Sequence, residues 1–199
     1  MKKRRQKRFN LIDQYKKCWR YLNESKNYLV FIIGLFFFSG FIGFFVPAPD
    51  WVYEKIVEFI SELLKETENL GQFGLIKYIF LNNVQSGFFV MIFGLFFGIF
   101  PIISTVLNGY LLGFVSYFAA QTEGISVLLQ LLPHGIFELP AIFISFALGI
   151  KLGTIPFKDK KRETFLNYIR ESLRVFFFVI LPLLVIAAII EGSLIFLGK

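Results

Sequence analysis

The chain has 199 residues, of which 56% are hydrophobic and 18% are charged, and its formal net charge is +7 at pH 7. With a mean hydropathy of +0.65, this composition excludes a water-soluble globular domain, and we expect many of its 28 Phe side chains to face acyl chains. A single cysteine, Cys18, excludes an intrachain disulfide and leaves the redox compartment open.

Residues 1–27 form a basic leading segment with ten Lys or Arg residues and only two acids. Apolar side chains recur at helical spacing from Phe9 to Tyr21 and basic ones lie between them, which predicts an amphipathic helix on an anionic membrane surface. A nucleic-acid-binding arm is the competing interpretation of residues 1–5. We expect no nucleic acid, because membrane orientation already explains the charge.

Five apolar stretches are long enough, at ~1.5 Å per residue, to cross a hydrocarbon core of about 30 Å or come close to it. They run over Tyr28–Val46, Asn82–Phe100, Ile103–Ala120, Ser126–Leu152 and Val175–Leu197. Pro101 predicts a tight hairpin between the second and third spans, and Pro133 leaves open whether the fourth is one helix or two. The expected organisation is a basic lead at 1–27, a first anchor at 28–46, an outer amphipathic segment at 47–76 and a four-span core at 77–199.

The segment after the first span is amphipathic and acidic. Between Asp50 and Glu68 it carries six acids against two lysines, and its apolar residues share one helical face: Tyr53, Ile56, Val57, Ile60, Leu63 and Leu64. We expect a helix from Trp51 to about Glu68 after an Asp50 N-cap, packed on the outer membrane surface or on a partner.

The charges predict the orientation of the bundle. Residues 1–27 and 151–174 are rich in Lys and Arg, which places both segments in the cytoplasm by the positive-inside rule, whereas the acidic segment 50–68 is placed outside. Five spans satisfy this alternation. We therefore expect a multi-pass protein of the cell membrane with a cytoplasmic N-terminus and an outer C-terminus.

A few polar residues stand where the spans should meet lipid. His134 and Glu138 are four residues apart, so they share a helix face, and Glu191 lies at a similar depth in the outer half of the membrane by a count of ~1.5 Å per residue. Asn82 and Asn83, at the start of the second span, complete this intramembrane polar set. Asn108 lies near the inner end of the third span, where we expect it to bridge helices.

Three interpretations of the polar set remain open. The first is a structural network in which a protonated Glu138 or Glu191 bonds to His134 or to an Asn. The second is a metal site in which His134, Glu138 and Glu191 hold a divalent ion such as zinc, with a position open for water. The third is a proton or ion pathway, since His and Glu relays recur in transporters.

Polar and small residues follow a defined order through the last four spans: Asn82-Asn83, Asn108-Gly109, Pro133-His134-Gly135 with Glu138, and Ala187-Ala188 with Glu191-Gly192. This order resembles the stage II sporulation protein M family of integral membrane proteins over roughly residues 77–195. In spore formers the resemblance implies a membrane component that acts with a wall-degrading enzyme and its activator during engulfment. Relatives also occur in organisms that form no spores.

The expected fold is an all-α, polytopic transmembrane helix bundle of about five spans with an extra-membrane amphipathic helix after the first. The favoured function is a noncatalytic membrane component that scaffolds or serves envelope partners. A transporter or channel-like subunit is the second interpretation, and an oligomer could supply the ring of charges that no single span carries. An intramembrane metalloenzyme is the third, because no catalytic triad, Cys pair or phosphate-binding Gly loop accompanies the polar set.

The predicted topology can be tested by labelling single cysteines from each side of the membrane. A Cys placed at Lys160 should react with an impermeant maleimide only after the membrane is opened, because residues 151–174 are expected inside. A Cys at Glu62 should react in intact cells. Labelling of position 160 from outside would overturn the orientation.

Overall fold

A computed structural model describes residues 10–124 and 132–198, apart from the side chains of residues 123 and 132–134, and all regular structure in these ranges is helical. Five stretches are long and apolar enough to cross a membrane, which confirms the predicted all-α, multi-span fold. The α-helices are α1 (Leu11–Glu24), α2 (Lys26–Phe45), α3 (Asp50–Thr67), α4 (Gln72–Phe93), α5 (Ile99–Glu123), α6 (Leu132–Gly153), α7 (Lys161–Val175) and α8 (Leu181–Leu197).

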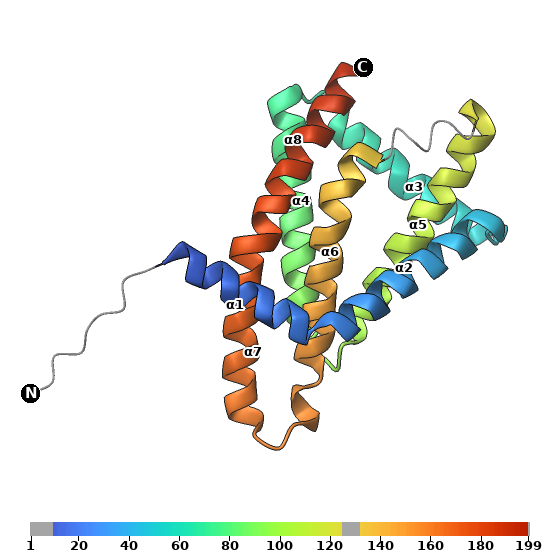
Figure 1. Ribbon diagram of the computed structural model, residues 1–199. Helices are drawn as coiled ribbons and strands as arrows, with labels where there is room; N and C mark the ends of the chain where they lie inside the picture. The colour runs from blue at the N-terminus through green and yellow to red at the C-terminus, as the bar shows by residue number, and fades with distance from the viewer. Residues whose placement is uncertain (1–9, 125–131, 199) are drawn as a thin grey trace, which may run out of the picture.

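The spans form two groups. Helices α4, α6 and α8 pack against one another, and α2 and α5 form a tightly packed pair that diverges from them towards one side (Figure 1). Helix α1 crosses the bundle near the start of α2 and contacts α7, which projects beyond the bundle at that end. The three-helix group carries most of the buried side chains, among them Leu148, Leu184 and Ala187.

Glycines set the contact between α2 and α5. A Cβ at Gly113 would overlap the carbonyl oxygen of Gly40, and one at Gly109 would overlap that of Phe36. The same applies between α4 and α6, where Gly94 faces the backbone of Gly149. Apolar side chains gain little by leaving lipid for a neighbouring helix, so backbones that approach this closely gain their stability from van der Waals contact.

The second and third spans are joined by a turn at Gly94–Gly98, where both Phe97 (φ 56°) and Gly98 (φ 74°) have positive φ. The expected second span, Asn82–Phe100, is therefore shifted: α4 begins ten residues earlier, at Gln72, and ends at Phe93. The sequence assigned residues 72–76 to the outer amphipathic segment, whereas they form the first turn of α4. A continuous helix is favoured there because it satisfies its own backbone hydrogen bonds as it enters the membrane.

Two other helix boundaries differ from the expected ones, and a third lies outside the described residues. Asp50 is the first residue of α3 and not its N-cap, because Pro49 takes that position and its carbonyl accepts from the amides of Val52 and Tyr53. The fifth span continues α7 through a π-helical turn at Phe176–Ile180. The fourth span is one helix from Leu132 onwards, and its expected start at Ser126 lies outside the described residues.

Helix α1 is attached to α7 by aromatic and polar contacts. The Tyr21 hydroxyl lies 3.3 Å from Ser172 Oγ and donates to the carbonyl of Tyr168 at 3.4 Å, and Tyr15 packs edge-on against Phe178. Cys18 and Tyr21 are almost completely buried in this contact. Burial raises the pKa of both side chains.

Cys18 reports on the attachment of α1. We expect it to react with N-ethylmaleimide at pH 7 at least about tenfold more slowly than an exposed cysteine, because it is 1% exposed and its raised pKa keeps the thiol protonated. Intact-mass spectrometry would measure the rate. An Asn23→Cys, Cys18→Ala variant provides the exposed control on the same helix. Equal rates for the two chains would show that α1 is not packed on α7.

Candidate functional site

Three polar residues from three different spans come together in the α4/α6/α8 group. The carboxyl of Glu138 in α6 lies close to the side chains of Glu191 in α8 and Asn83 in α4. Glu191 Oε2 is buried and has no hydrogen-bond partner among the described residues. The cluster is therefore polar, half-buried and not fully satisfied.

Helix positions explain why the two carboxyl groups meet. Glu138 lies six residues after the start of α6, and Glu191 lies six residues before the end of α8, which is about 9 Å in each case. These two helix ends are at the same end of the bundle (Figure 1). Asn83 lies about midway along α4, and not at the start of the span as the sequence indicated, because α4 begins at Gln72.

Close helix packing surrounds the cluster. A Cβ at Gly192 would lie 2.6 Å from Ile76 Cγ1 and 2.8 Å from Ile76 N, so the residue next to Glu191 must be small for α8 to approach α4. One turn further out, Gln72 Nε2 donates to Ser193 Oγ at 3.1 Å and links the same two helices. The position of Glu191 is thus set by the α4–α8 contact.

The chemistry of this cluster is that of a paired carboxyl site. A hydrogen bond between two carboxyl groups requires a proton on one of them, and burial of two unpaired carboxylates would be costly. Carboxylate oxygens also bind metal ions. The site can therefore hold a proton, and a cation could take the proton's place between the oxygens of Glu138 and Glu191.

The predicted third ligand, His134, lies in the first turn of α6, four residues before Glu138. A four-residue spacing places both on one helix face, but the side chain of His134 is outside the described residues. Among the side chains that are described, no three His, Cys, Asp or Glu residues converge in a manner that could hold a metal. The metal site proposed from the sequence thus rests on Glu138, Glu191 and the backbone position of His134.

The other two predicted polar residues lie elsewhere. Asn82 is exposed on α4, next to Asn83 but on a different face. Asn108 Nδ2 donates to the carbonyl of Ser104 at 2.7 Å, so its hydrogen bond lies within α5 and not between helices, as the sequence indicated. An Asn side chain in a helix can donate to a backbone carbonyl of the preceding turn, so Asn108 is satisfied without a partner on another helix.

Two buried polar side chains were not anticipated. Ser145 Oγ donates to the carbonyl of Gly87 at 2.6 Å and joins α6 to α4. Lys151, assigned from the sequence to a solvated basic segment, is 4% exposed, and its Nζ donates to Ser25 Oγ at 2.9 Å and lies 3.6 Å from the centre of the Tyr21 ring. The only signal in the sequence is the position of Lys151 within an otherwise apolar helix.

Comparison with known proteins confirms the family resemblance. The family model of stage II sporulation protein M matches residues 28–194. The chain belongs to this family. The match includes the first span and the outer helix α3, which the residue-level resemblance had left out. It therefore covers all five spans and the whole polar cluster.

Two members of the curated set, both uncharacterized proteins of Methanocaldococcus jannaschii, are similar to the chain. MJ0706 is 32% identical over 185 residues, which is 84% of this chain and 78% of the relative. MJ0793 is 33% identical over 122 residues, which is 57% of this chain and 66% of the relative. No solved structure matches. Family membership thus extends to an archaeon, and neither relative's name describes an activity.

Proposed function

We propose that the protein is a noncatalytic integral membrane component that scaffolds an envelope partner, and that the partner binds to α3. The observation that carries this proposal is an acidic ridge on α3, an exposed row of carboxylates that repeats every four residues: Asp50, Glu54, Glu58, Glu62 and Glu66. Residues four apart are neighbours on a helix surface, so the row forms a continuous ridge that winds slowly around α3. The chain has a net charge of +7, whereas the ridge is negatively charged. A positively charged partner would be attracted to the ridge.

The acidic ridge is held in place and remains charged. Lys55 Nζ lies 2.6 Å from Glu58 Oε2, and this contact holds the pKa of the Glu58 carboxyl below its usual value. Glu66 accepts a hydrogen bond of 2.6 Å from the Tyr78 hydroxyl, which ties the end of α3 to α4. The ridge therefore remains negatively charged, and its last residue is tied to α4.

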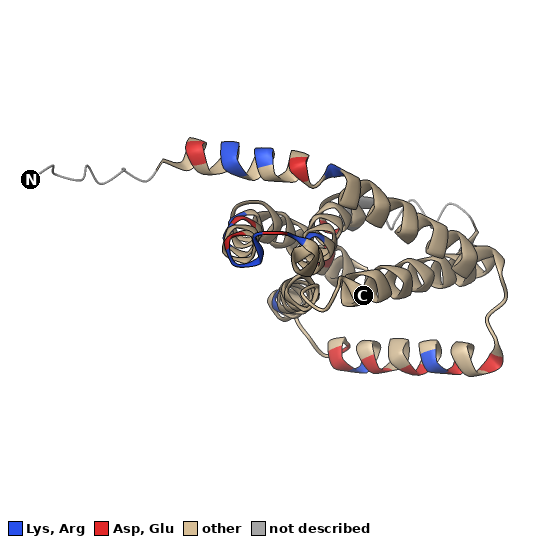
Figure 2. Ribbon diagram, turned by 90° about the horizontal axis from the view of Figure 1, so that it is seen from below, with Lys and Arg blue, Asp and Glu red and all other residues tan. Residues whose placement is uncertain are grey.

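The apolar side of α3 leaves room for side chains of a partner. No residue of α3 is buried, and the helix stands apart from the spans with charged residues along it (Figure 2). Two cavities of about 430 and 300 Å³ lie between α3 and α5, the first lined by Trp51, Phe59 and Leu107 among others and the second by Tyr53 and Phe114 among others. A partner segment that is both basic and apolar fits this combination of ridge and cavities.

Photo-crosslinking from α3 in native membranes would test the proposal. A photoreactive residue at Leu64, which is 64% exposed, should form an adduct with a protein that carries a Lys- or Arg-rich segment, identified by mass spectrometry. Neutralising the ridge with Glu54→Gln, Glu58→Gln and Glu62→Gln should reduce the adduct about tenfold or more, because the attraction between opposite charges is lost. The matched control, Asp159→Asn with Glu163→Gln, removes acids near the start of α7 and should leave the adduct unchanged.

Other adducts would reject the proposal. Crosslinks only to lipid would show that α3 rests on the membrane, and crosslinks between two copies of the chain would show a homo-oligomer. An adduct that survives neutralisation of the ridge would also contradict a charge-selected partner.

A second candidate function is binding of a proton or a metal cation within the membrane, as in a transporter or channel-like subunit. The specific observation in its favour is the buried oxygen of Glu191 that has no hydrogen-bond partner among the described residues, beside the carboxyl of Glu138. Buried carboxyl groups at membrane depth are costly to retain and commonly serve ion or proton pathways.

Two measurements on proteoliposomes would test the second candidate: zinc content after exposure to the ion, and proton flux reported by a pH-sensitive dye. Bound zinc or proton flux in the unmodified protein should fall about tenfold or more in Glu138→Gln and in Glu191→Gln, because each variant removes one charged oxygen pair. Asn108→Ala, which changes a polar residue outside the cluster, should have no effect. The candidate fails if the unmodified protein shows neither zinc binding nor flux.

A further inference from the structure

A second polar site lies at the opposite end of the bundle, between α1 and α7. It is a cavity of about 340 Å³ with mostly polar walls, and its charged lining residues are Lys17, Arg20, Glu24, Arg170, Glu171 and Arg174. Four cations against two acids leave an excess of positive charge around an open space. We call this cavity the α1/α7 pocket.

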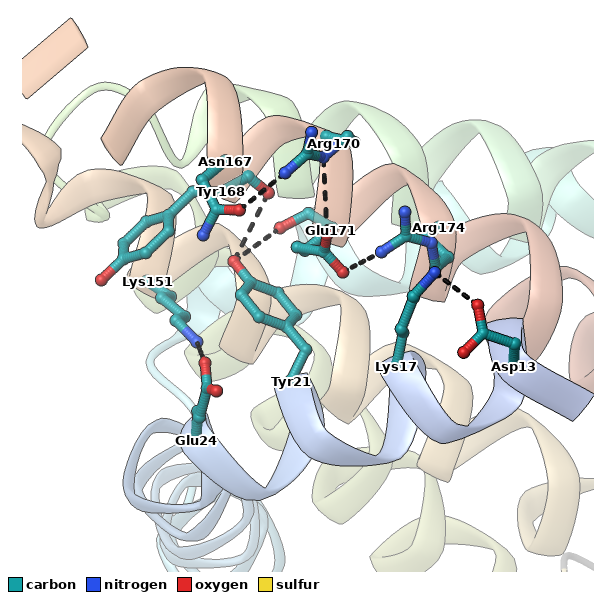
Figure 3. A network of polar contacts seen from close by, with 11 residues as sticks. Asp13, Lys17, Tyr21, Glu24, Lys151, Asn167, Tyr168, Arg170, Glu171 and Arg174 are labelled. Carbon is teal, nitrogen blue, oxygen red and sulfur yellow. Dashed lines mark hydrogen bonds and ion pairs between the residues drawn. The ribbon is translucent and has the colours of Figure 1, made fainter. Parts of the chain in front are cut away.

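Both acids of the α1/α7 pocket are already engaged. Glu171 is shared between two arginines, with Arg170 Nε at 3.5 Å from its Oε1 and Arg174 paired with its other oxygen. Glu24 lies 3.8 Å from the Nζ of the buried Lys151 (Figure 3). Lys17 is paired with Asp13, which lies outside the lining, at 2.6 Å (Figure 3). Arg20 forms no ion pair among the described residues, so its positive charge is not compensated.

Two of the cationic groups, Arg170 and Arg174, are held in position by the walls. Arg170 Nη2 donates to Asn167 Oδ1 at 3.0 Å, and Arg174 is anchored by Glu171 (Figure 3). Tyr21, which also lines the pocket, is fixed to α7 by its hydroxyl contacts with Tyr168 and Ser172. Little side-chain ordering is therefore needed for an anion to bind.

The apolar face of α1 indicates that the α1/α7 pocket lies at the level of the lipid headgroups. The residues on the other side of α1 are apolar and exposed: Leu11, Ile12, Tyr15 and Trp19 are 56, 66, 51 and 76% exposed. Such a face enters the boundary between headgroups and acyl chains, where Trp is favoured. The polar side of α1 then lies at the level of the lipid phosphates.

We propose that the α1/α7 pocket binds the phosphate group of an anionic phospholipid. Arginine guanidinium groups match phosphate oxygens in pairs, and a lysine adds a third direction of attraction. Arg20 is the residue left free to contact the phosphate directly, and Arg174 and Lys17 face the same cavity. This is a discrete site for one headgroup, in contrast to the general attraction of a basic segment to an anionic membrane.

Native mass spectrometry of the purified full-length chain in neutral detergent would test this site. Dihexanoyl phosphatidylglycerol should bind saturably with one molecule per chain, and dihexanoyl phosphatidylcholine should not. Arg20→Gln should weaken binding about tenfold, the effect of one charge-assisted contact. Arg162→Gln is the matched control, because it removes the same charge from exposed α7 surface outside the pocket. Protection of Cys18 from maleimide would show that α1 stays packed in each variant.

A parallel titration with inorganic phosphate distinguishes binding of a lipid headgroup from binding of free phosphate. Weak or absent binding of phosphate, with tight binding of the lipid, supports a headgroup site that also uses the acyl chains. Equal binding of both, with the same loss in Arg20→Gln, supports recognition of phosphate alone. Equal weakening by Arg20→Gln and Arg162→Gln, or no saturable binding of either probe, would overturn the proposal.

Discussion

The fold depends on the close approach of helix backbones to one another. In the hydrocarbon of a bilayer the hydrophobic effect does not drive helices together, so close backbone contact must stabilise their packing. Acyl chains are as apolar as the Phe and Leu side chains of the spans, so burial of those side chains against a neighbour contributes little. Contacts such as Gly113 with Gly40, and Gly94 with Gly149, instead bring main chains together. Many large apolar side chains consequently remain on the outside of the bundle, Phe38 and Phe41 among them, where lipid covers them.

The same close approach creates the setting of the carboxyl cluster. Helix α8 can reach α4 because Gly192 is small, and Glu191 next to it is then carried into the interior with Glu138 and Asn83. In a membrane interior, a polar side chain that is buried without a polar neighbour costs desolvation free energy. Bringing the three side chains together offsets part of the cost that each would have alone. Glu191 Oε2 still has no hydrogen-bond partner among the described residues, so packing does not remove the whole desolvation cost.

The two ends of the bundle differ in chemistry. At one end, α1 and α7 pack much as helices of a soluble protein do, with a buried tyrosine, ion pairs around Glu171 and a buried Lys151 under an aromatic ring. At the other end, α3 has no buried residue and carries an acidic ridge over apolar cavities. The chain thus presents a basic surface at one end of the bundle and an acidic, exposed helix at the other.

The sequence by itself determined the number of spans, the all-α class and the amphipathic helix after the first span. These follow from the length of apolar stretches against a fixed hydrocarbon thickness, and hydropathy reports that directly. It did not determine that α4 starts at Gln72, that Asn83 and not Asn82 reaches Glu138, or that Lys151 is buried. These features depend on the rotation of each helix about its axis and on which neighbour it meets. Only the packing of α4, α6 and α8, and of α1 on α7, decides them. A helix that is apolar on all sides has no amphipathic pattern, so its sequence does not indicate which side faces a neighbouring helix.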